Sequence, residues 1–431
     1  MSDVLALLGG NPLIRDAFPK FNSFNQQEEF AALKVIKSGN LSSYLGYPGD
    51  KFYGGEEVLN FEEEFCLKFK VKHSMSMNSW TSGLWAIFGA LNLEPGSEVL
   101  VSTWTMAATA TTILHWGLIP VFVDINPRTF NIDFEDLLGK STDNTRAVVS
   151  PDIFGLSAEN LKLRNWCDSR GIFLVSDSAQ SPLATDEFGN YTSTLSHIGG
   201  FSLNYHKHIH TGEGGVVVTE NSELAERVRM LRNHGEVAVG FGSEFQKAQR
   251  GILGMNLRMG EIEAAIGSVQ LTKVDSLVTS RREAGLSLSE GLAELPGLHT
   301  TFIPQGYQHS FYVSGFLIDY NENPLLPHRD VLVSALRAEG VPGLMSGYQN
   351  IHKLPLFQQQ LAVGSEGWPF SLLKKSKRNE LYQTRLAVAE FYHSNTFFGI
   401  NMCAHNYTPS DLEQIIAAFK KVWRLAPSLP R

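Results

Sequence analysis

The residue most able to do covalent chemistry is a lysine beside a glycine-rich turn. Lys207 follows the strand-like run GGFSLN and comes before Gly212, Gly214 and Gly215. A lysine amine attacks an aldehyde when burial or a nearby cation lowers its pKa, and glycines let a backbone approach a ligand closely. Taken alone, the segment is better explained by an exposed loop lysine than by a reactive one. The covalent hypothesis therefore depends on cofactor-binding residues in other segments.

An aspartate at the end of an apolar strand is the second candidate. Asp177 ends the run IFLVSD, and Gln180 follows three residues later. An acid is costly at such a place unless it meets a cation. The protonated pyridine nitrogen of pyridoxal phosphate (PLP) is such a cation, and PLP enzymes pair it with an aspartate; Gln180 can donate to the ring oxygen. A solvated loop acid or a helix cap explains the spacing equally well.

A run of small hydroxyl residues opens a predicted helix after another strand. Thr81 and Ser82 lie in the run NSWTSGL, over residues 78–84. Free amide groups and the helix dipole at such a point favour a phosphate. An ordinary helix cap is the better reading of this run when it is taken alone.

Three histidines alternate around the lysine, at His206, His208 and His210. A strand-like alternation would place all three on one face by its period. No carboxylate or cysteine stands beside them at ligand spacing, so we expect no metal site. Roles for individual imidazoles near a substrate stay open, since a neutral imidazole can move protons.

These candidates stand at the ends of apolar runs that alternate with helical patterns between residues 70 and 220. The predicted strands are HSMSM, EVLVS, PVFVDI, RAVVS and IFLVSD, and the predicted helices include 82–91 and 161–170. Such alternation predicts a mostly parallel α/β sheet with helices on both faces. Ligands bind beyond the carboxyl ends of the strands in such sheets, so we expect the candidate residues to meet at one edge.

The length of 431 residues favours two domains. A long helical pattern covers 259–278, and after residue 297 short strands alternate with helices up to the closing run DLEQIIAAFKKVWR. We therefore predict an N-terminal arm over 1–30, a large domain over 31–290 and a small C-terminal α+β domain over 291–431.

Composition narrows the class of protein. The net charge of −8 argues against nucleic acid or an anionic membrane as a partner, because phosphate binding needs a basic face. Three scattered cysteines form no disulfide or metal pattern, and neither a signal peptide nor a membrane-spanning run is visible. We expect a cytoplasmic protein. A nicotinamide-binding function is not favoured, since no G-x-G-x-x-G opens a helix after an early strand.

With these segments in this order, the chain resembles the DegT/StrS-type sugar aminotransferases, a branch of the fold-type I PLP enzymes. The likeness covers nearly the whole chain, and each motif alone is weak, whereas their joint order and spacing is highly specific. The matching segments include 120–125, 177–180, Lys207 with 212–215, and 232–235.

The resemblance implies roles for the candidate residues. Lys207 forms a Schiff base with PLP and moves the proton between substrate and cofactor, Asp177 pairs with the pyridine nitrogen, and Gln180 contacts the ring hydroxyl. Three hydroxyl residues hold the phosphate: Thr81, Ser82 and Ser202. Asn256 reaches the phosphate of the neighbouring subunit, which implies a homodimer with shared active sites. Tyr312 and Tyr348 fall in segments that line the substrate pocket in relatives. His208 is a further substrate candidate on the chemistry of its imidazole alone, independent of the resemblance.

The chain departs from relatives at three places. Relatives usually carry an aromatic ring over the cofactor where this chain has Met106, so either Met106 packs on the ring as a thioether or Trp104 takes over the stacking. Trp80 and Gly83 are atypical in the phosphate-binding run. Some relatives replace the lysine by histidine and act as dehydratases, whereas Lys207 is retained here, which favours transamination.

The predicted activity is transfer of an amino group from glutamate or glutamine to a keto sugar or keto cyclitol. The N-terminal Leu-Gly-Gly and the run SGYQ at 346–349 favour the cyclitol branch. The alternatives are a PLP-dependent dehydratase or aminohydroxybenzoate-type synthase, and a PLP-binding regulatory protein without turnover. The intact lysine, aspartate and phosphate-binding run argue against lost catalysis.

Overall fold

A computed structural model describes residues 4–46, 49–235 and 252–430 of the chain. Its larger sheet has seven strands in the order β1-β7-β6-β5-β4-β2-β3. The strands are β1 (His73–Met77), β2 (Glu98–Ser102), β3 (Ile119–Val123), β4 (Thr145–Pro151), β5 (Phe173–Asp177), β6 (Ile198–Ser202) and β7 (Gly215–Thr219). All pairs from β6 across to β3 are parallel, and β7 runs antiparallel to β6 and β1. The predicted mostly parallel sheet is confirmed.

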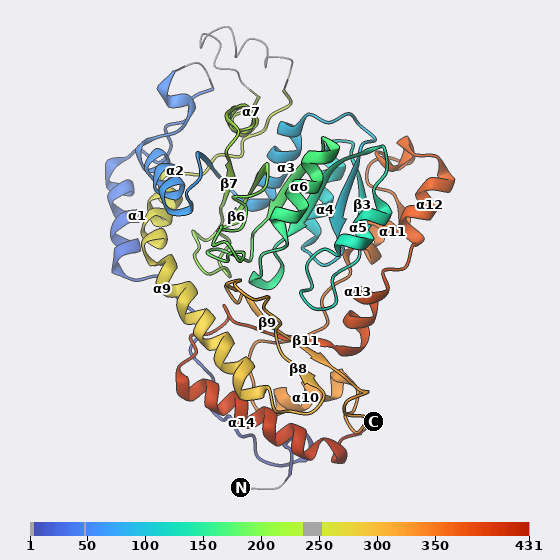
Figure 1. Ribbon diagram of the computed structural model, residues 1–431. Coiled ribbons are helices and arrows are strands. Elements are labelled where there is room, and N and C mark those ends of the chain that lie inside the picture. The colour runs from blue at the N-terminus through green and yellow to red at the C-terminus, as the bar shows by residue number, and fades with distance from the viewer. Residues whose placement is uncertain (1–3, 47–48, 236–251, 431) are drawn as a thin grey trace.

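Helices cover both faces of this sheet (Figure 1). One face packs against α3 (Trp80–Leu91), α4 (Ala107–His115) and α7 (Ser222–Arg232). The other packs against α2 (Glu56–Phe69), α5 (Phe134–Lys140), α6 (Asn160–Arg170) and part of α9. The alternation is visible within β7, where Val217 faces the first group and Val216 and Val218 face the second. Burial on both sides explains why these strands read as continuous apolar runs.

The long helix α9 (Glu261–Leu292) connects the large sheet with a smaller one (Figure 1). Beside its first half lies α1 (Gln26–Ser38), which a capping box of Asn25 and Glu28 begins. The smaller sheet is antiparallel, with the order β10-β11-β9-β8. Its strands are β8 (Leu298–His299), β9 (Val313–Ile318), β10 (Leu344–Ser346) and β11 (Phe397–Asn401), and α10 (Arg329–Ala338) and α14 (Pro409–Leu425) pack on it.

Two segments pack across the predicted domain boundaries. The N-terminal arm buries Leu5, Ile14 and Phe18 in the apolar core of the small sheet. The segment with α11 (Pro355–Gln359), α12 (Lys375–Gln383) and α13 (Ala387–Phe391) returns to the large sheet. The hydroxyl of Tyr382 donates there to the carbonyl of Pro120, at 2.7 Å. None of the helices in the described ranges is long and apolar enough to cross a membrane.

Candidate active site

A cavity of about 230 Å³ opens at the carboxyl ends of β4, β5 and β6. Six of the predicted cofactor-binding residues line it: Thr81, Met106, Asp177, Gln180, Ser202 and Lys207. They come from five separate segments, which supports the expectation that strand ends gather the candidate residues at one edge.

Lys207 lies at this cavity on the loop between β6 and β7, and only 8% of the residue is exposed. Its Nζ sits 4.4 Å from the centroid of the Tyr312 ring. The described residues give this amine no salt bridge. Burial lowers the pKa of Lys207 to about 8, while the charge of Asp177 and, to a smaller extent, Cys403 oppose the shift. A sizeable share of uncharged, nucleophilic amine is therefore available near neutral pH.

Asp177 is held by donors from three different segments. Its Oδ1 accepts hydrogen bonds from the indole Nε1 of Trp80, at 2.7 Å, and from the backbone N–H of Ala179, at 3.2 Å. Its Oδ2 accepts from the hydroxyl of Thr109, at 2.7 Å. All of these donors are neutral, and within the described ranges no salt bridge pairs the carboxylate with a cation.

The N-terminus of α3 forms one wall of the cavity, with Ser79, Trp80 and Thr81 among the lining residues. Ser79 caps the helix, and its Oγ accepts from the backbone N–H of Ser82, at 3.1 Å. The Ser82 hydroxyl lies 2.9 Å from the same oxygen. Ser82 is thus engaged in the cap rather than lining the cavity, whereas Thr81 lines it directly. Helix N-termini of this kind favour anions.

The structure separates the two candidates for stacking on a cofactor. Met106 lines the cavity and is 65% exposed in the single chain. Trp104 is fully buried and does not line the cavity, and its Nε1 donates to Oδ1 of Asn350, at 2.9 Å. Its ring packs among aromatic neighbours that include Phe130 and Phe397. Met106 is therefore the one placed to contact a ligand.

The remaining predicted residues lie in different places. Tyr348 stands next to the cavity, where its hydroxyl accepts from Nε2 of Gln180, at 3.4 Å. His208 does not line the cavity, because its ring is buried and its Nε2 lies 2.8 Å from the carbonyl oxygen of Ser310. Asn256 is exposed and outside the cavity of its own chain, and its Oδ1 accepts from Nε of Arg258, at 2.9 Å.

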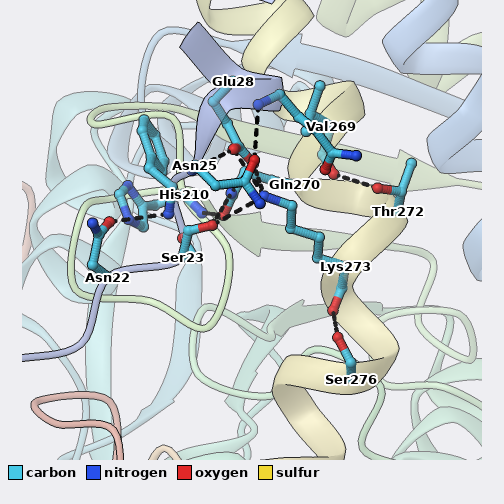
Figure 2. Close-up of polar contacts among 12 residues, drawn as sticks. Asn22, Ser23, Asn25, Glu28, His210, Val269, Gln270, Thr272, Lys273 and Ser276 are labelled. Atoms are coloured by element: carbon cyan, nitrogen blue, oxygen red, sulfur yellow. Dashed lines mark hydrogen bonds and ion pairs between the residues drawn. The ribbon is translucent and has the colours of Figure 1, made fainter.

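A buried polar network joins the loop that carries Lys207 to helices α1 and α9 (Figure 2). The backbone N–H of His210 donates to Oε1 of Gln270 on α9, at 3.3 Å, and the same oxygen accepts from the hydroxyl of Ser23, at 2.7 Å. Nε2 of Gln270 donates to Glu28, which also pairs with Lys273. The first turn of α1, α9 and the lysine loop are thereby joined.

The family model of the DegT/DnrJ/EryC1/StrS aminotransferases matches residues 47–371. The chain belongs to this aminotransferase family. The aminotransferase is 28% identical to a Streptoalloteichus tenebrarius protein named for an L-glutamine:3-amino-2,3-dideoxy-scyllo-inosose aminotransferase, and the alignment covers 100% of both chains. It is 30% identical over 304 residues to the GDP-perosamine synthase of Vibrio cholerae, covering 70% of this chain and 80% of that relative.

Among solved structures, one of GDP-4-keto-6-deoxymannose-3-dehydratase with a trapped PLP-glutamate geminal diamine matches with a TM-score of 0.75. The identity is 22%, and the match covers 94% of this chain and 100% of that one. At this identity, the likeness shows that the two chains share a fold.

Sequence reasoning missed three residues of the aminotransferase site. Trp80 and Thr109 hold Asp177, and neither was given that role. Asp152, just after β4, also lines the cavity, and burial raises its pKa to about 7 despite hydrogen bonds from Ser178, Ala158 and Asn160. An acid at the end of an apolar strand was the available signal for Asp152, the same signal that identified Asp177.

Proposed function

We propose that this aminotransferase uses PLP bound to Lys207 to move an amino group from glutamate or glutamine to the ketone of a sugar or cyclitol. The observation that carries the proposal is the pairing of two groups in one cavity. Among the described residues Lys207 is a buried amine without a salt bridge, and it shares the cavity with Asp177, a carboxylate held by neutral donors.

The residues of the cavity fit PLP at four points. The Lys207 amine suits an aldehyde, and Asp177 suits a protonated ring nitrogen. The N-terminus of α3 with Thr81, together with Ser202 at the end of β6, suits a phosphate. Gln180, which lines the same cavity, is available to the ring hydroxyl. Bound there, PLP would withdraw electrons from the substrate carbon that bears the amine.

The chain's own residues supply the proton transfer and the orientation. As general base and then acid, the Lys207 amine would take a proton from the substrate carbon that bears the amine and deliver it to the aldehyde carbon of the bound cofactor. Its pKa of about 8 suits both roles near neutral pH. Met106 packs on the ring as a thioether, and Tyr348 and Tyr312 border the substrate side.

The acceptor class is supported by full-length likeness to a relative named for a glutamine:inosose aminotransferase. Asn256 is exposed and outside its own cavity. We therefore assign it to the phosphate of a second copy, so that the active unit is a homodimer with shared sites.

Amine transfer tests the proposal directly. PLP-loaded protein is mixed with glutamine or glutamate carrying ¹⁵N at the α-amino group and with a keto cyclitol or a nucleotide-linked keto sugar. Mass spectrometry should show ¹⁵N in one acceptor, and Lys207→Ala should abolish both the transfer and the visible absorbance of the lysine-bound cofactor. Loss of water from the acceptor without gain of nitrogen would assign a dehydratase instead. Cofactor binding with no change of either substrate would assign a regulatory protein.

A further inference from the structure

We infer that Trp80 is a positioning residue that aims the carboxylate of Asp177 at the ring nitrogen of the cofactor. The inference rests on the proposed function, because it concerns the acid that would meet the pyridine ring. Its starting point is the bond from indole Nε1 to Oδ1 of Asp177, which is 2.7 Å long and lies between two buried side chains.

The indole is locked by close contact with two glycines. A Cβ atom added to Gly83 of α3 would lie 2.9 Å from Cε3 of the indole, and one added to Gly200 of β6 would lie 2.5 Å from its Cζ3. Side chains at either position would overlap the ring, so these glycines form the slot that it fills. Because Trp80 is only 6% exposed, the ring has no solvent-facing alternative within this packing.

The two shortest hydrogen bonds to Asp177 reach different oxygens of its carboxylate. Trp80 holds Oδ1 from α3, and Thr109 holds Oδ2 from α4, each at 2.7 Å. Donors on opposite oxygens fix the plane of the carboxylate, which is otherwise free to turn about its last torsion. Each oxygen accepts more than one hydrogen bond, so Oδ2 keeps an acceptor site for the ring nitrogen.

Trp80 also links the two ends of the cofactor site. It is the first residue of α3, so its backbone N–H belongs to the helix N-terminus that faces the anion end of the cavity. Its indole N–H meets Asp177 at the other end. A single rigid residue thereby sets the separation between the phosphate site and the acid that receives the pyridine nitrogen.

The experiment compares wild type, Trp80→Phe and Trp116→Phe. Trp116 is a matched control, since its Nε1 donates over the same 2.7 Å to the carbonyl of Trp85, outside the cavity. PLP is titrated into each cofactor-free protein to obtain a Kd, and the visible absorbance of the loaded protein is then followed against pH. Circular dichroism and thermal unfolding report on folding.

Trp80→Phe should raise the Kd for PLP by about tenfold, the effect of losing one hydrogen bond to a charged acceptor. Its absorbance midpoint should also move to higher pH. A poorly held Asp177 leaves the ring nitrogen less protonated, and a ring without that positive charge makes the lysine-bound nitrogen a stronger base. A role in packing alone lowers the unfolding temperature but does not move this midpoint. Trp116→Phe should match wild type in both readouts.

A second variant, Gly83→Ala, keeps the indole and displaces it from its slot, and should shift both readouts in the same direction by a smaller amount. A Trp80→Phe protein with the Kd and midpoint of wild type overturns the inference. If Trp80→Phe does not fold, wild-type values for Gly83→Ala overturn it instead. Wild-type protein that develops no visible band with PLP counts against the proposed function, which is a separate failure.

Discussion

The buried carboxyl of Asp152 lowers the free energy of unfolding when it ionises, so replacing Asp152 with asparagine should stabilise the protein at high pH. Its Oδ1 accepts from the backbone N–H of Ala158, at 2.8 Å, and from Nδ2 of Asn160, at 2.9 Å. Its Oδ2 accepts from the hydroxyl of Ser178, at 2.5 Å. An asparagine can keep the first two bonds through its oxygen and donate to Ser178 through its nitrogen, so Asp152→Asn preserves the contacts and removes the charge.

The size of the effect follows from the pKa of Asp152, which burial raises from 3.8 to about 7. A shift of about three units corresponds to roughly 4 kcal/mol, at about 1.4 kcal/mol per unit. Between these two pH values the folded state binds more protons than the unfolded state, so the free energy of unfolding falls as the pH rises. The loss is roughly 2 kcal/mol by pH 5 and nearly complete by pH 8. The advantage of Asp152→Asn should therefore grow by about 2 to 3 kcal/mol between pH 5 and pH 8.

Urea unfolding of the cofactor-free proteins at pH 5 and pH 8 measures this difference. Asp275→Asn is the control, because Asp275 is exposed and its pair with Lys68 is a surface contact of small energetic value. That control should change the free energy of unfolding by similar, small amounts at both pH values. An Asp152→Asn advantage that is constant with pH, or larger at pH 5, would refute the argument that burial holds this acid protonated.

Two further predictions concern the lysine and the dimer. The rate of PLP uptake by the cofactor-free protein should rise with pH up to about 8 and then level off, because the pKa of Lys207 is lowered to about 8 and only the uncharged amine attacks. Stopped-flow absorbance measures this rate. A rate that keeps rising to pH 10 contradicts the lowered pKa. Mixing the inactive variants Lys207→Ala and Asn256→Ala should restore activity if each site takes these residues from different copies, since half of the sites in a mixed dimer are then intact. If the two variants exchange subunits and activity does not recover, Asn256 has another role.

The strand ends of the large sheet could be predicted because buried parallel strands leave a strong trace in the sequence. A strand covered on both faces is apolar throughout, so a polar residue at its end stands out. Asp177 after FLVS was found in this way, whereas the role of Ser202 after IGGF came from the family resemblance. The structure places both at one cavity. Lys207 lies in a loop without a periodic sequence pattern, so it was identified from the reactivity of its amine instead.

The histidines around Lys207 show where such reasoning fails. An alternating pattern predicts one shared face only if the segment is a strand. Residues 203–214 are not in a strand, and the three rings diverge. His206 lines the cavity, His208 lies against the carbonyl of Ser310, and His210 stacks on Phe24 with ring centroids 4.6 Å apart. A turn in place of a strand thus separates the three rings, and His208 does not line the cavity.

The contact of Trp80 with Asp177 could not be predicted, because its cause lies in tertiary packing. The two residues are 97 positions apart, and the space for the indole is left by Gly83 and Gly200. Both Trp80 and Gly83 stood out in the sequence as unusual residues in a phosphate-binding run. Nothing in that run shows that the absent side chain at 83 makes room for the ring at 80, since β6 closes the slot from another part of the chain.

The neutrality of the groups around Asp177 matters as much as their geometry. An arginine at position 80 would bind the carboxylate more strongly than an indole, but it would compete with a protonated pyridine nitrogen for the same charge. In the part of the chain that the structure describes, no salt bridge to Asp177 forms, and an indole and a hydroxyl hold it instead. Trp80 and Thr109 thus orient the carboxylate while leaving its charge for the ring, and that same charge tempers the drop in the pKa of Lys207. Replacing Trp80 by a cation should therefore weaken cofactor binding even though it satisfies Asp177 better.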